Sequence, residues 1–506
     1  MSNIRRQSII SSGIIYFGFA LGFLNTYLFT KEGGFTKSEY GLTGTFIAFA
    51  NIMYSFANLG MQAFIYKFYP YYEDNLSVKE NDMITWALLN SMIGFALVLT
   101  GGILFKDLVI RKFGANSADL IKYYYWIFPF GFGLTMYSLL EAFAWQLKKS
   151  VLTNFLREVL FRLITTVLIV LSFVGTIKYF GTFIKLYACA YIVLFIILLA
   201  VLLARKEIHL TLNVSRVTKK FFKKIVALAS FVWSGALIYN IASVFDIIVI
   251  AAVMPNGLAY VGIFTLAQNI ASLIQAPQRG IIAASIAPLS KAWKDKDFEK
   301  IRRVYYHSSI NQLIFAIGMF MLIWINFTDG VFTFRLQRGY LDARYVFLFL
   351  GLMRIVDMGT GVNSQIIVTS IHWRFEFFTG IILLALSLPL NYILTKELGV
   401  IGPAIATFLA MAVYNGLRYL FLLRKYKLQP FTRKTTYVVI LGLVSYLICH
   451  SLFNQYHGFL WILARSGLFV LIYLGSVIFF DLTPDIKPVW ATVKKRLGIV
   501  SRKNSV

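Results

Sequence analysis

Long apolar stretches recur along almost the whole chain, separated by short polar segments. A helix needs about 20 apolar residues to cross the hydrocarbon core of a bilayer, and fourteen segments approach that length. They are 9–29, 41–66, 83–105, 122–145, 158–177, 183–204, 227–253, 259–287, 309–327, 345–370, 375–394, 400–423, 435–454 and 459–481. The pattern predicts an all-α, polytopic membrane protein with about 14 transmembrane helices.

The positive charges between these segments predict an orientation. With the N-terminus inside, the inner segments carry 32 Lys and Arg residues and the outer loops carry 10. Short loops rich in Lys and Arg stay on the cytoplasmic side, so both termini are expected to be cytoplasmic. The first segment is too long for a signal peptide and lacks a small-residue cleavage site, so it is expected to remain as a span.

Composition agrees with a membrane protein and disfavours a nucleic-acid binder. Hydrophobic residues make up 58% of the 506 residues and charged residues only 14%, well below the quarter or so that is usual in globular domains. The net charge of +27 could suit nucleic acid. However, the basic residues form short clusters between apolar runs, so membrane lipids are the expected partner and nucleic acid is not. Cys189 and Cys449 lie in separate apolar segments and indicate no redox compartment.

The longest basic inner segment divides the chain into parts. Between Arg216 and Lys224, Phe221 and Phe222 alternate with lysines, which suits an amphipathic helix on the anionic inner leaflet. A simple positive-inside anchor explains the same charges equally well. The predicted parts are a six-helix half (1–204), this linker (205–226), a second six-helix half (227–428), and two extra helices with a basic tail (429–506).

Polar positions inside the spans repeat between the two halves. Asn51, Ser55, Asn58 and Gln62 have the spacing of one helical face, and the same spacing recurs in the second half in Gln268, Ser272, Gln275 and Arg279. The number of positions that separates the first polar set from the second also separates Glu141 from Asp357, to within one position. It likewise separates Glu158 from Glu376 to within one position. Transporters are often built from such repeats. We therefore expect two pseudo-symmetric halves.

The arrangement resembles a known superfamily. Six plus six spans with a basic link and two further spans are similar to the multidrug/oligosaccharidyl-lipid/polysaccharide (MOP) exporters, which have the MATE-like fold. Within it, the stretches 5–10, 33–41 and 311–314 resemble bacterial polysaccharide-biosynthesis proteins of the Wzx flippase type. The resemblance implies a protein of the bacterial inner membrane. It also implies transfer of a polyprenyl-pyrophosphate-linked oligosaccharide to the outer leaflet by alternating access, with a polysaccharide polymerase as partner.

Signatures of enzymes are missing from the sequence. The five histidines have no metal-ligand spacing, and no Gly-Lys pair exists that could form a Walker A loop. Asp295 and Asp297 form a D-x-D pair, but lysines surround it in a short loop, which is typical of a solvated charge run. We therefore expect no catalytic residues, no metal and no cofactor, with transport coupled to a proton or Na⁺ gradient.

Charges inside the spans supply the candidate site. Arg279 and Arg354 lie far from span ends, where a charge costs a few kcal/mol and usually faces a partner or a wet cavity. The guanidinium fork suits the pyrophosphate. Internal ion pairs such as Arg354–Asp357 are the structural alternative. The expected sugar-binding residues, in a central cavity, are Asn25, Asn58, Gln268 and Gln275, and the candidates for the coupling ion are Asp246, Asp357 and Glu141.

Three other functions remain open at this stage. A cation-coupled multidrug exporter has the same fold, but is expected to have an apolar cavity with few arginines. A lipid II flippase is a close relative that the sequence separates poorly from the oligosaccharide flippase. A membrane polysaccharide polymerase or ligase would favour a large outer loop, whereas the longest outer loop here has 17 residues.

Overall fold

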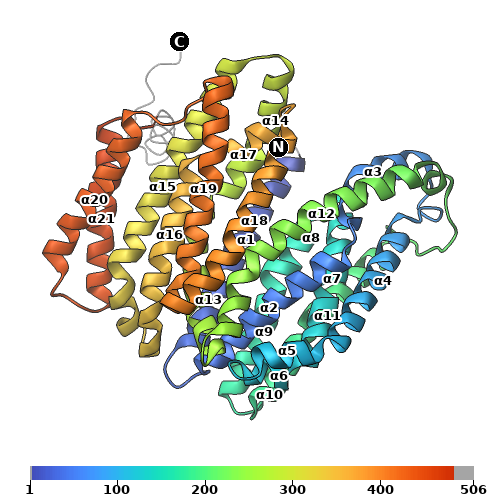
Figure 1. Ribbon diagram of the computed structural model, residues 1–506, viewed down its shortest axis with the longest axis horizontal. Coiled ribbons are helices and arrows are strands. Elements are labelled where there is room, and N and C mark those ends of the chain that lie inside the picture. The colour runs from blue at the N-terminus through green and yellow to red at the C-terminus, as the bar shows by residue number, and fades with distance from the viewer. Residues whose placement is uncertain (1–2, 484–506) are drawn as a thin grey trace. The chain divides into compact units, whose positions relative to one another are not determined.

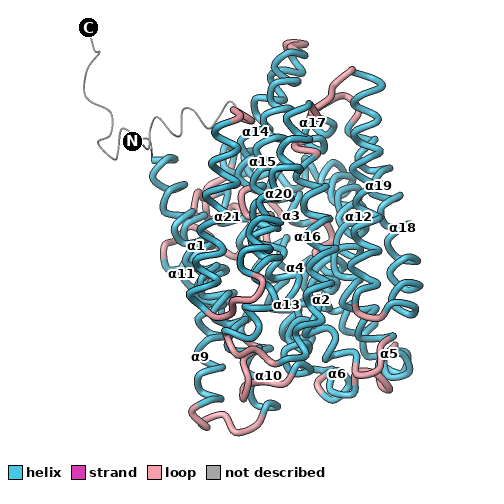
Figure 2. The backbone as a smooth tube through the Cα atoms, turned by 90° about the vertical axis from the view of Figure 1, so that its left-hand side faces the viewer, coloured by secondary structure: helices cyan, strands magenta, loops and turns pink. Residues whose placement is uncertain are grey.

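A computed structural model describes residues 3–483, and all of its regular elements are helices. Figure 2 shows these helices joined by short loops. The chain forms two compact units, the first comprising Met1–Thr265 with Asn391–Val400 and the second Leu266–Leu390 with Ile401–Val506.

The first unit contains the helices that precede the middle of the chain (Figure 1). They are α1 (Asn3–Thr30), α2 (Lys37–Ala57), α3 (Met61–Asn75), α4 (Met83–Leu104), α5 (Lys106–Phe113), α6 (Ala118–Lys122), η1 (Tyr124–Trp126), α7 (Ile127–Gln146), α8 (Ser150–Asn154), the π-helical turn η2 (Phe155–Leu160), α9 (Phe161–Phe173), α10 (Phe180–Ala188), α11 (Ala190–Ala204) and α12 (Arg216–Val253). The basic run of the predicted linker forms the first turns of α12, which continues without a break into the next span.

The second unit contains most of the remaining helices. They are α14 (Gln278–Lys294), α15 (Phe298–Thr333), η3 (Arg338–Asp342), α16 (Ala343–Gly359), α17 (Asn363–Val368), α19 (Ile401–Tyr426), α20 (Arg433–Phe453) and α21 (Phe459–Phe479). Two helices, α13 (Gly257–Ile274) and α18 (Trp373–Leu398), contribute residues to both units.

Every predicted span coincides with one helix or with two consecutive helices, which confirms the all-α membrane fold. In the described part of the chain, eleven helices are long and apolar enough to cross a membrane. The other three predicted spans, 41–66, 158–177 and 345–370, are interrupted or mixed with π-helix. The count of fourteen therefore stays a prediction.

Two polar stripes were each expected to lie on one face of a continuous helix. The structure shows instead that a helix break divides each of them. The polar stripe that begins at Asn51 is split where α2 ends, because Leu59 and Gly60 adopt left-handed backbone angles. The stripe that begins at Gln268 is split between α13 and α14, just before Gln278, where Pro277 has no N–H to continue the helix. The offset between Gly60 and Pro277 is the same as that between the two sets of polar positions, so the breaks repeat with them.

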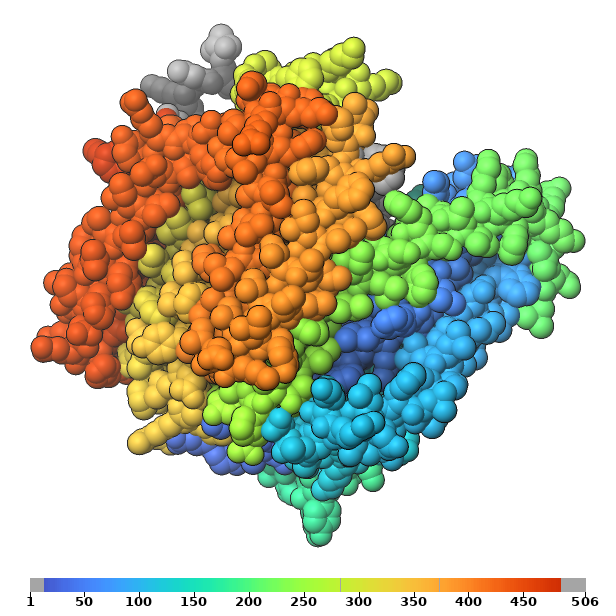
Figure 3. Space-filling view, viewed as in Figure 1, coloured from blue at the N-terminus to red at the C-terminus, as the bar shows by residue number. Residues whose placement is uncertain are grey.

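Each unit has its own apolar core. Helix α7 is the centre of the first, because most of its residues are buried and it packs against α2, α4 and α11. In the second, α15 packs against α16, α20 and α21. Figure 1 shows α20 and α21 side by side along α15, and Tyr473 of α21 donates a hydrogen bond to the Ile314 carbonyl across 2.9 Å. The space-filling view shows the same pair at the surface of the second unit (Figure 3).

Candidate functional site

A chain of polar side chains surrounds the break between α2 and α3. Tyr54 donates its hydroxyl to Gln62 Oε1 across 2.6 Å, and Asn58 Nδ2 donates to the Tyr54 hydroxyl across 3.3 Å. Gln62 Nε2 donates in turn to the Tyr66 hydroxyl across 3.2 Å. These bonds satisfy polar groups within the predicted span 41–66, where lipid would offer no hydrogen bond. The predicted residue Asn58 thus belongs to a network of neutral donors and acceptors.

The ion pair between Arg157 and Glu141 interacts electrostatically with two tyrosines of this network. Arg157 Nη1 is 2.9 Å from Glu141 Oε2, and Tyr54 and Tyr66 interact electrostatically with both charges. The Glu141 side chain is 4% exposed and its Oε1 has no hydrogen-bond partner, whereas the Arg157 side chain is 45% exposed. Arg157 can therefore bind an anion while it neutralises the buried carboxylate.

Local backbone geometry positions Arg157. It belongs to η2, a π-helical turn inserted between α8 and α9, and such turns often occur at functional sites. Close by in sequence, the Trp145 ring stacks on Tyr66 with 6.3 Å between ring centres and 7° between planes. Both rings are partly exposed. An exposed guanidinium together with exposed aromatic rings suits a ligand that carries both phosphate and sugar.

Asn25 has a different environment. Its Nδ2 donates to the Arg162 carbonyl across 2.9 Å, and the Thr166 hydroxyl donates to its Oδ1 across 2.6 Å. These two bonds join α1 to α9, and the side chain is buried. Arg162 forms an ion pair with Glu158 across 3.0 Å. Asn25 therefore links two helices with both ends of its amide.

A second polar cluster lies in the second unit, where α16 ends. Asp357 accepts hydrogen bonds from Gln278 Nε2 across 2.9 Å and from Asn415 Nδ2 across 3.2 Å. Asn415 Oδ1 in turn accepts from Thr360 and from Asn363, which lie on either side of the break between α16 and α17. The carboxylate of Asp357 is thus held by neutral amides from two other helices.

Beside this cluster, a buried ion pair joins α18 to α19. Arg418 Nε donates to Glu376 Oε2 across 2.9 Å, and Tyr414 and Ser364 donate to the other carboxylate oxygen, across 3.2 Å and 2.8 Å. Arg418 is only 5% exposed. It does not extend to the membrane surface, as an arginine near a span end often does, because the partly buried Glu376 lies beside it.

The remaining predicted residues lie apart from these contacts. Arg279 is exposed on α14 directly after Gln278, and Arg354 is partly buried on α16, one turn before Asp357. Gln268 is partly buried on α13, and Gln275 lies in the turn that follows. The structure therefore brings Gln278 and Asp357 together. The two predicted arginines are near neighbours of these residues in the sequence.

Asp246 is buried in α12 of the first unit. The same unit contains Asn391, which is fully buried and whose amide nitrogen and oxygen have no hydrogen-bond partner in the described part of the chain. Within residues 3–483, no three His, Cys, Asp or Glu side chains cluster closely enough to hold a metal ion.

Arg157 is the main residue that sequence reasoning missed. It was counted with the inner segment 146–157, because hydropathy places the start of the next span after it. A buried acid on the preceding span, Glu141, was the one available signal that a basic partner should exist. The residues Gln278, Asn415 and Asn391 were missed because the search inside the spans singled out charged side chains, and single uncharged amides were considered only where they formed a stripe.

Comparisons with known proteins identify the fold. No protein-family profile and no curated protein sequence matches the chain. The structure is similar to that of the lipid II flippase MurJ in an inward closed conformation, with a TM-score of 0.72 and 18% identity over 94% of this chain and 99% of that one. The chain has the MurJ/MATE fold.

Multidrug transporters have the same architecture over a smaller share of the chain. An inward-facing MATE family transporter of the MOP superfamily has a TM-score of 0.61 and 19% identity, covering 80% of this chain and 93% of that one. A MATE protein in complex with MaL6 has a TM-score of 0.55 and 18% identity over 82% and 94%. These neighbours are transporters and a flippase, and this chain shares their multi-span helical architecture.

Proposed function

We propose that the protein is a flippase that moves a polyprenyl-pyrophosphate-linked oligosaccharide from the cytoplasmic to the outer leaflet of a bacterial inner membrane by alternating access. The observation that carries this proposal is the extent of the MurJ-like architecture. The match covers 94% of this chain, and the uncovered remainder is shorter than α20 and α21 together, which have 21 residues each. The MurJ match therefore includes at least part of the C-terminal pair α20 and α21. The MATE matches cover only 80% and 82% of this chain.

The polar clusters supply the chemistry that this cargo needs. Arg157 presents a half-exposed guanidinium beside amide and hydroxyl groups, and Arg279 is exposed on α14. Guanidinium groups bind the pyrophosphate bidentately, and the amides of Asn58, Gln268 and Gln275 bind sugar hydroxyls. Broken helices next to polar side chains are typical of the substrate sites of transporters.

Coupling to an ion gradient is the second part of the proposal. The carboxylates of Asp246, Asp357 and Glu141 are the candidates for a proton or Na⁺, because a buried carboxylate changes its occupancy when its surroundings change. Asp357 fits best, since neutral amides leave its negative charge without a compensating cation among its hydrogen-bond partners.

Lipid II is the second candidate cargo, and the same MurJ-like architecture is equally consistent with it. A strain that lacks the gene distinguishes the cargoes. We expect loss of surface polysaccharide and accumulation of its lipid-linked repeat unit on the cytoplasmic side, with normal cell-wall synthesis. Accumulation of lipid II would instead assign the second cargo. Unchanged lipid intermediates combined with drug sensitivity would overturn both and indicate a multidrug exporter.

The arginines are tested in the same strain. We expect Arg279→Ala and Arg354→Ala each to abolish polysaccharide export at an unchanged membrane level of the protein, and Arg157→Ala to abolish export per molecule of protein in the membrane. Arg302→Ala is the control, because this exposed arginine forms an ion pair with Glu299 on the same helix. Normal export in all three variants would remove these arginines from the mechanism.

A further inference from the structure

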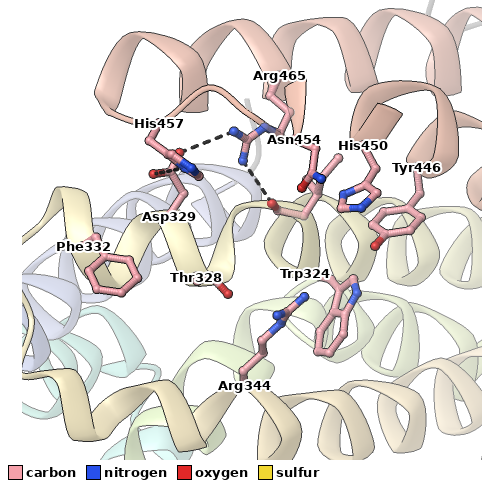
Figure 4. A pocket seen from close by; sticks show the side chains of 11 residues that line it. Trp324, Thr328, Asp329, Phe332, Arg344, Tyr446, His450, Asn454, His457 and Arg465 are labelled. Carbon is pink, nitrogen blue, oxygen red and sulfur yellow. Dashed lines mark hydrogen bonds and ion pairs between the residues drawn. The ribbon is translucent and has the colours of Figure 1, made fainter. Parts of the chain in front are cut away.

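A cavity of about 530 Å³ lies in the second unit, away from the polar clusters described above. Its walls come from the last turns of α15, the first turn of α16, and the facing ends of α20 and α21 (Figure 4). In the predicted topology these ends are at the outer face of the membrane. The chemistry of this cavity is independent of the identity of the transported cargo, because none of the proposed transport residues lines it.

One side of the cavity is an ion-pair network in which Arg465 and Asp329 bind each other and nearby backbone groups. Arg465 is 5% exposed and its Nη2 lies 3.4 Å from Asp329 Oδ2, while it also donates to the carbonyls of Tyr456 across 2.8 Å and Ile325 across 3.1 Å. The other Asp329 oxygen accepts from the Gly458 N–H across 3.2 Å and lies 3.6 Å from His457 Nδ1. The negative charge of Asp329 is thus neutralised within the wall, so it does not repel an anion.

The opposite side carries a cation without an acidic partner. The Arg344 guanidinium lies over the Trp324 ring, 4.6 Å from its centre, which fixes its orientation. Within residues 3–483, no carboxylate lies within ion-pair distance of Arg344, and its buried Nε has no hydrogen-bond partner. The buried hydroxyl of Thr328 also has no partner. Buried donors are rarely left unsatisfied, and Figure 4 shows both side chains at the cavity.

The surroundings of the cavity are those of a membrane interface. Tyr456 and Trp461 stack with 4.2 Å between ring centres at the turn between α20 and α21, and Trp and Tyr are enriched at headgroup level. The apolar side chains of Phe459, Leu460 and Leu463 on the adjoining turns of α21 are exposed and suited to contact acyl chains. A ligand held here can therefore place a charged group in the cavity and a hydrocarbon part outside it.

We propose that this cavity binds the phosphate of a membrane phospholipid, with Arg344 and Thr328 as its donors. A phosphodiester supplies acceptors for the guanidinium and for the hydroxyl, and the Arg344 charge is balanced when the site is filled. The bound lipid joins α16 to the α20–α21 pair at the outer interface. The site is separate from the proposed transport residues.

The test uses the full-length protein in an uncharged detergent and measures affinity by thermophoresis. The three probes are dihexanoyl phosphatidylglycerol, dihexanoylglycerol, which lacks the phosphate, and glycerol phosphate, which lacks the chains. We expect phosphatidylglycerol to bind more tightly than either of the others. Equal affinity for dihexanoylglycerol would overturn the role of the phosphate, and equal affinity for glycerol phosphate would overturn its lipid origin.

Substitutions then locate the site. Arg344→Gln should weaken phosphatidylglycerol binding by about tenfold or more, which is the usual scale for one charge-assisted contact. Arg338→Gln is the matched control, because it removes the same charge from the same outer segment but does not line the cavity. Thr328→Val should weaken binding without lowering the unfolding temperature, since the hydroxyl that it removes has no hydrogen-bond partner within residues 3–483. Wild-type affinity in both Arg344→Gln and Thr328→Val would refute the proposal.

Discussion

Glu141 and Arg157 form an ion pair with two unequal environments: the carboxylate is almost fully buried, and the guanidinium across 2.9 Å is half-exposed. The buried partner depends on the exposed one for neutralisation, while the exposed one can also be hydrated. An isolated buried charge is far more costly than an exposed one. A ligand anion that binds Arg157 therefore binds a residue whose ion pair with Glu141 already stabilises the first unit.

This asymmetry predicts unequal effects of the two neutral substitutions. Arg157→Gln leaves the Glu141 carboxylate buried without a cation and should cost about 1–3 kcal/mol. Glu141→Gln removes the buried charge and leaves a hydrated arginine, so it should cost less than about 1 kcal/mol. Thermal unfolding in one detergent measures both, and the double variant should recover most of the loss caused by Arg157→Gln. Equal losses in the two single variants would contradict the asymmetry.

Two glycines with left-handed backbone angles allow a matched test of the break between α2 and α3. A Cβ on Gly60 (φ 75°) would lie 2.2 Å from the Ala229 carbonyl oxygen of α12, whereas a Cβ on Gly175 (φ 83°) would meet no atom within 4 Å. Gly175→Ala should cost only the backbone strain, about 1 kcal/mol.

Gly60→Ala should cost about 2–4 kcal/mol, because α12 must also move away from the break. The difference in unfolding temperature between the two variants is the measurement. Similar values would show that the close approach of α12 contributes nothing to stability.

Asp357→Asn tests the proposed coupling residue. If Asp357 carries the coupling cation, the amide loses the charge that attracts it, and the dependence of transport on the ion gradient should fall by roughly tenfold, within the usual range of coupling free energies. Transport into proteoliposomes with and without the gradient measures this change. Asp342→Asn is the control, since Asp342 is an exposed carboxylate at the start of α16. An unchanged gradient dependence in Asp357→Asn would exclude this residue as the ion carrier.

The turn before α18 should respond to pH. Partial burial and, to a smaller degree, the Lys425 charge lower the pKa of His372 below its ordinary value. The folded state therefore favours the neutral imidazole. The contribution of this residue to stability is fully present above the unfolded pKa of about 6.5, and it declines as the pH falls from there through the lower folded pKa.

Lys425→Gln should raise the pKa of His372 toward its ordinary value. The pH profile of His372 acylation, followed by mass spectrometry, measures that pKa, because only the neutral ring reacts. His209, another histidine of an inner segment, serves as the reference in the same digest. A profile for His372 that does not move in Lys425→Gln would contradict the electrostatic effect of Lys425.

Much of the fold was predictable because bilayer thickness imposes a length on every span. The apolar segments 83–105 and 435–454 agree with α4 and α20 to within a few residues. The interruptions were less predictable. Gly60 and Pro277 are visible in the sequence, but glycine and proline are common in transmembrane helices, and neither by itself requires a break.

The candidate site was predictable only in part. Asp357 and Glu141 were recognised because a charge inside a span is costly and therefore conspicuous. Their partners were not, since Asn415 is far along the chain from Asp357 and only the packing of α16 against α19 brings the two together. Arg157 looked like a loop residue until its π-helical turn placed it beside Glu141.

The sequence by itself determined the all-helical membrane fold and predicted an orientation for its spans, because hydrophobic length and loop charge act locally along the chain. The tertiary structure alone decided which buried charges are neutralised, which amides hold Asp357, and that Arg344 has no acidic partner among the described residues. Those outcomes depend on contacts of a few ångströms between helices that are distant in sequence, and no local pattern of residues specifies such distances.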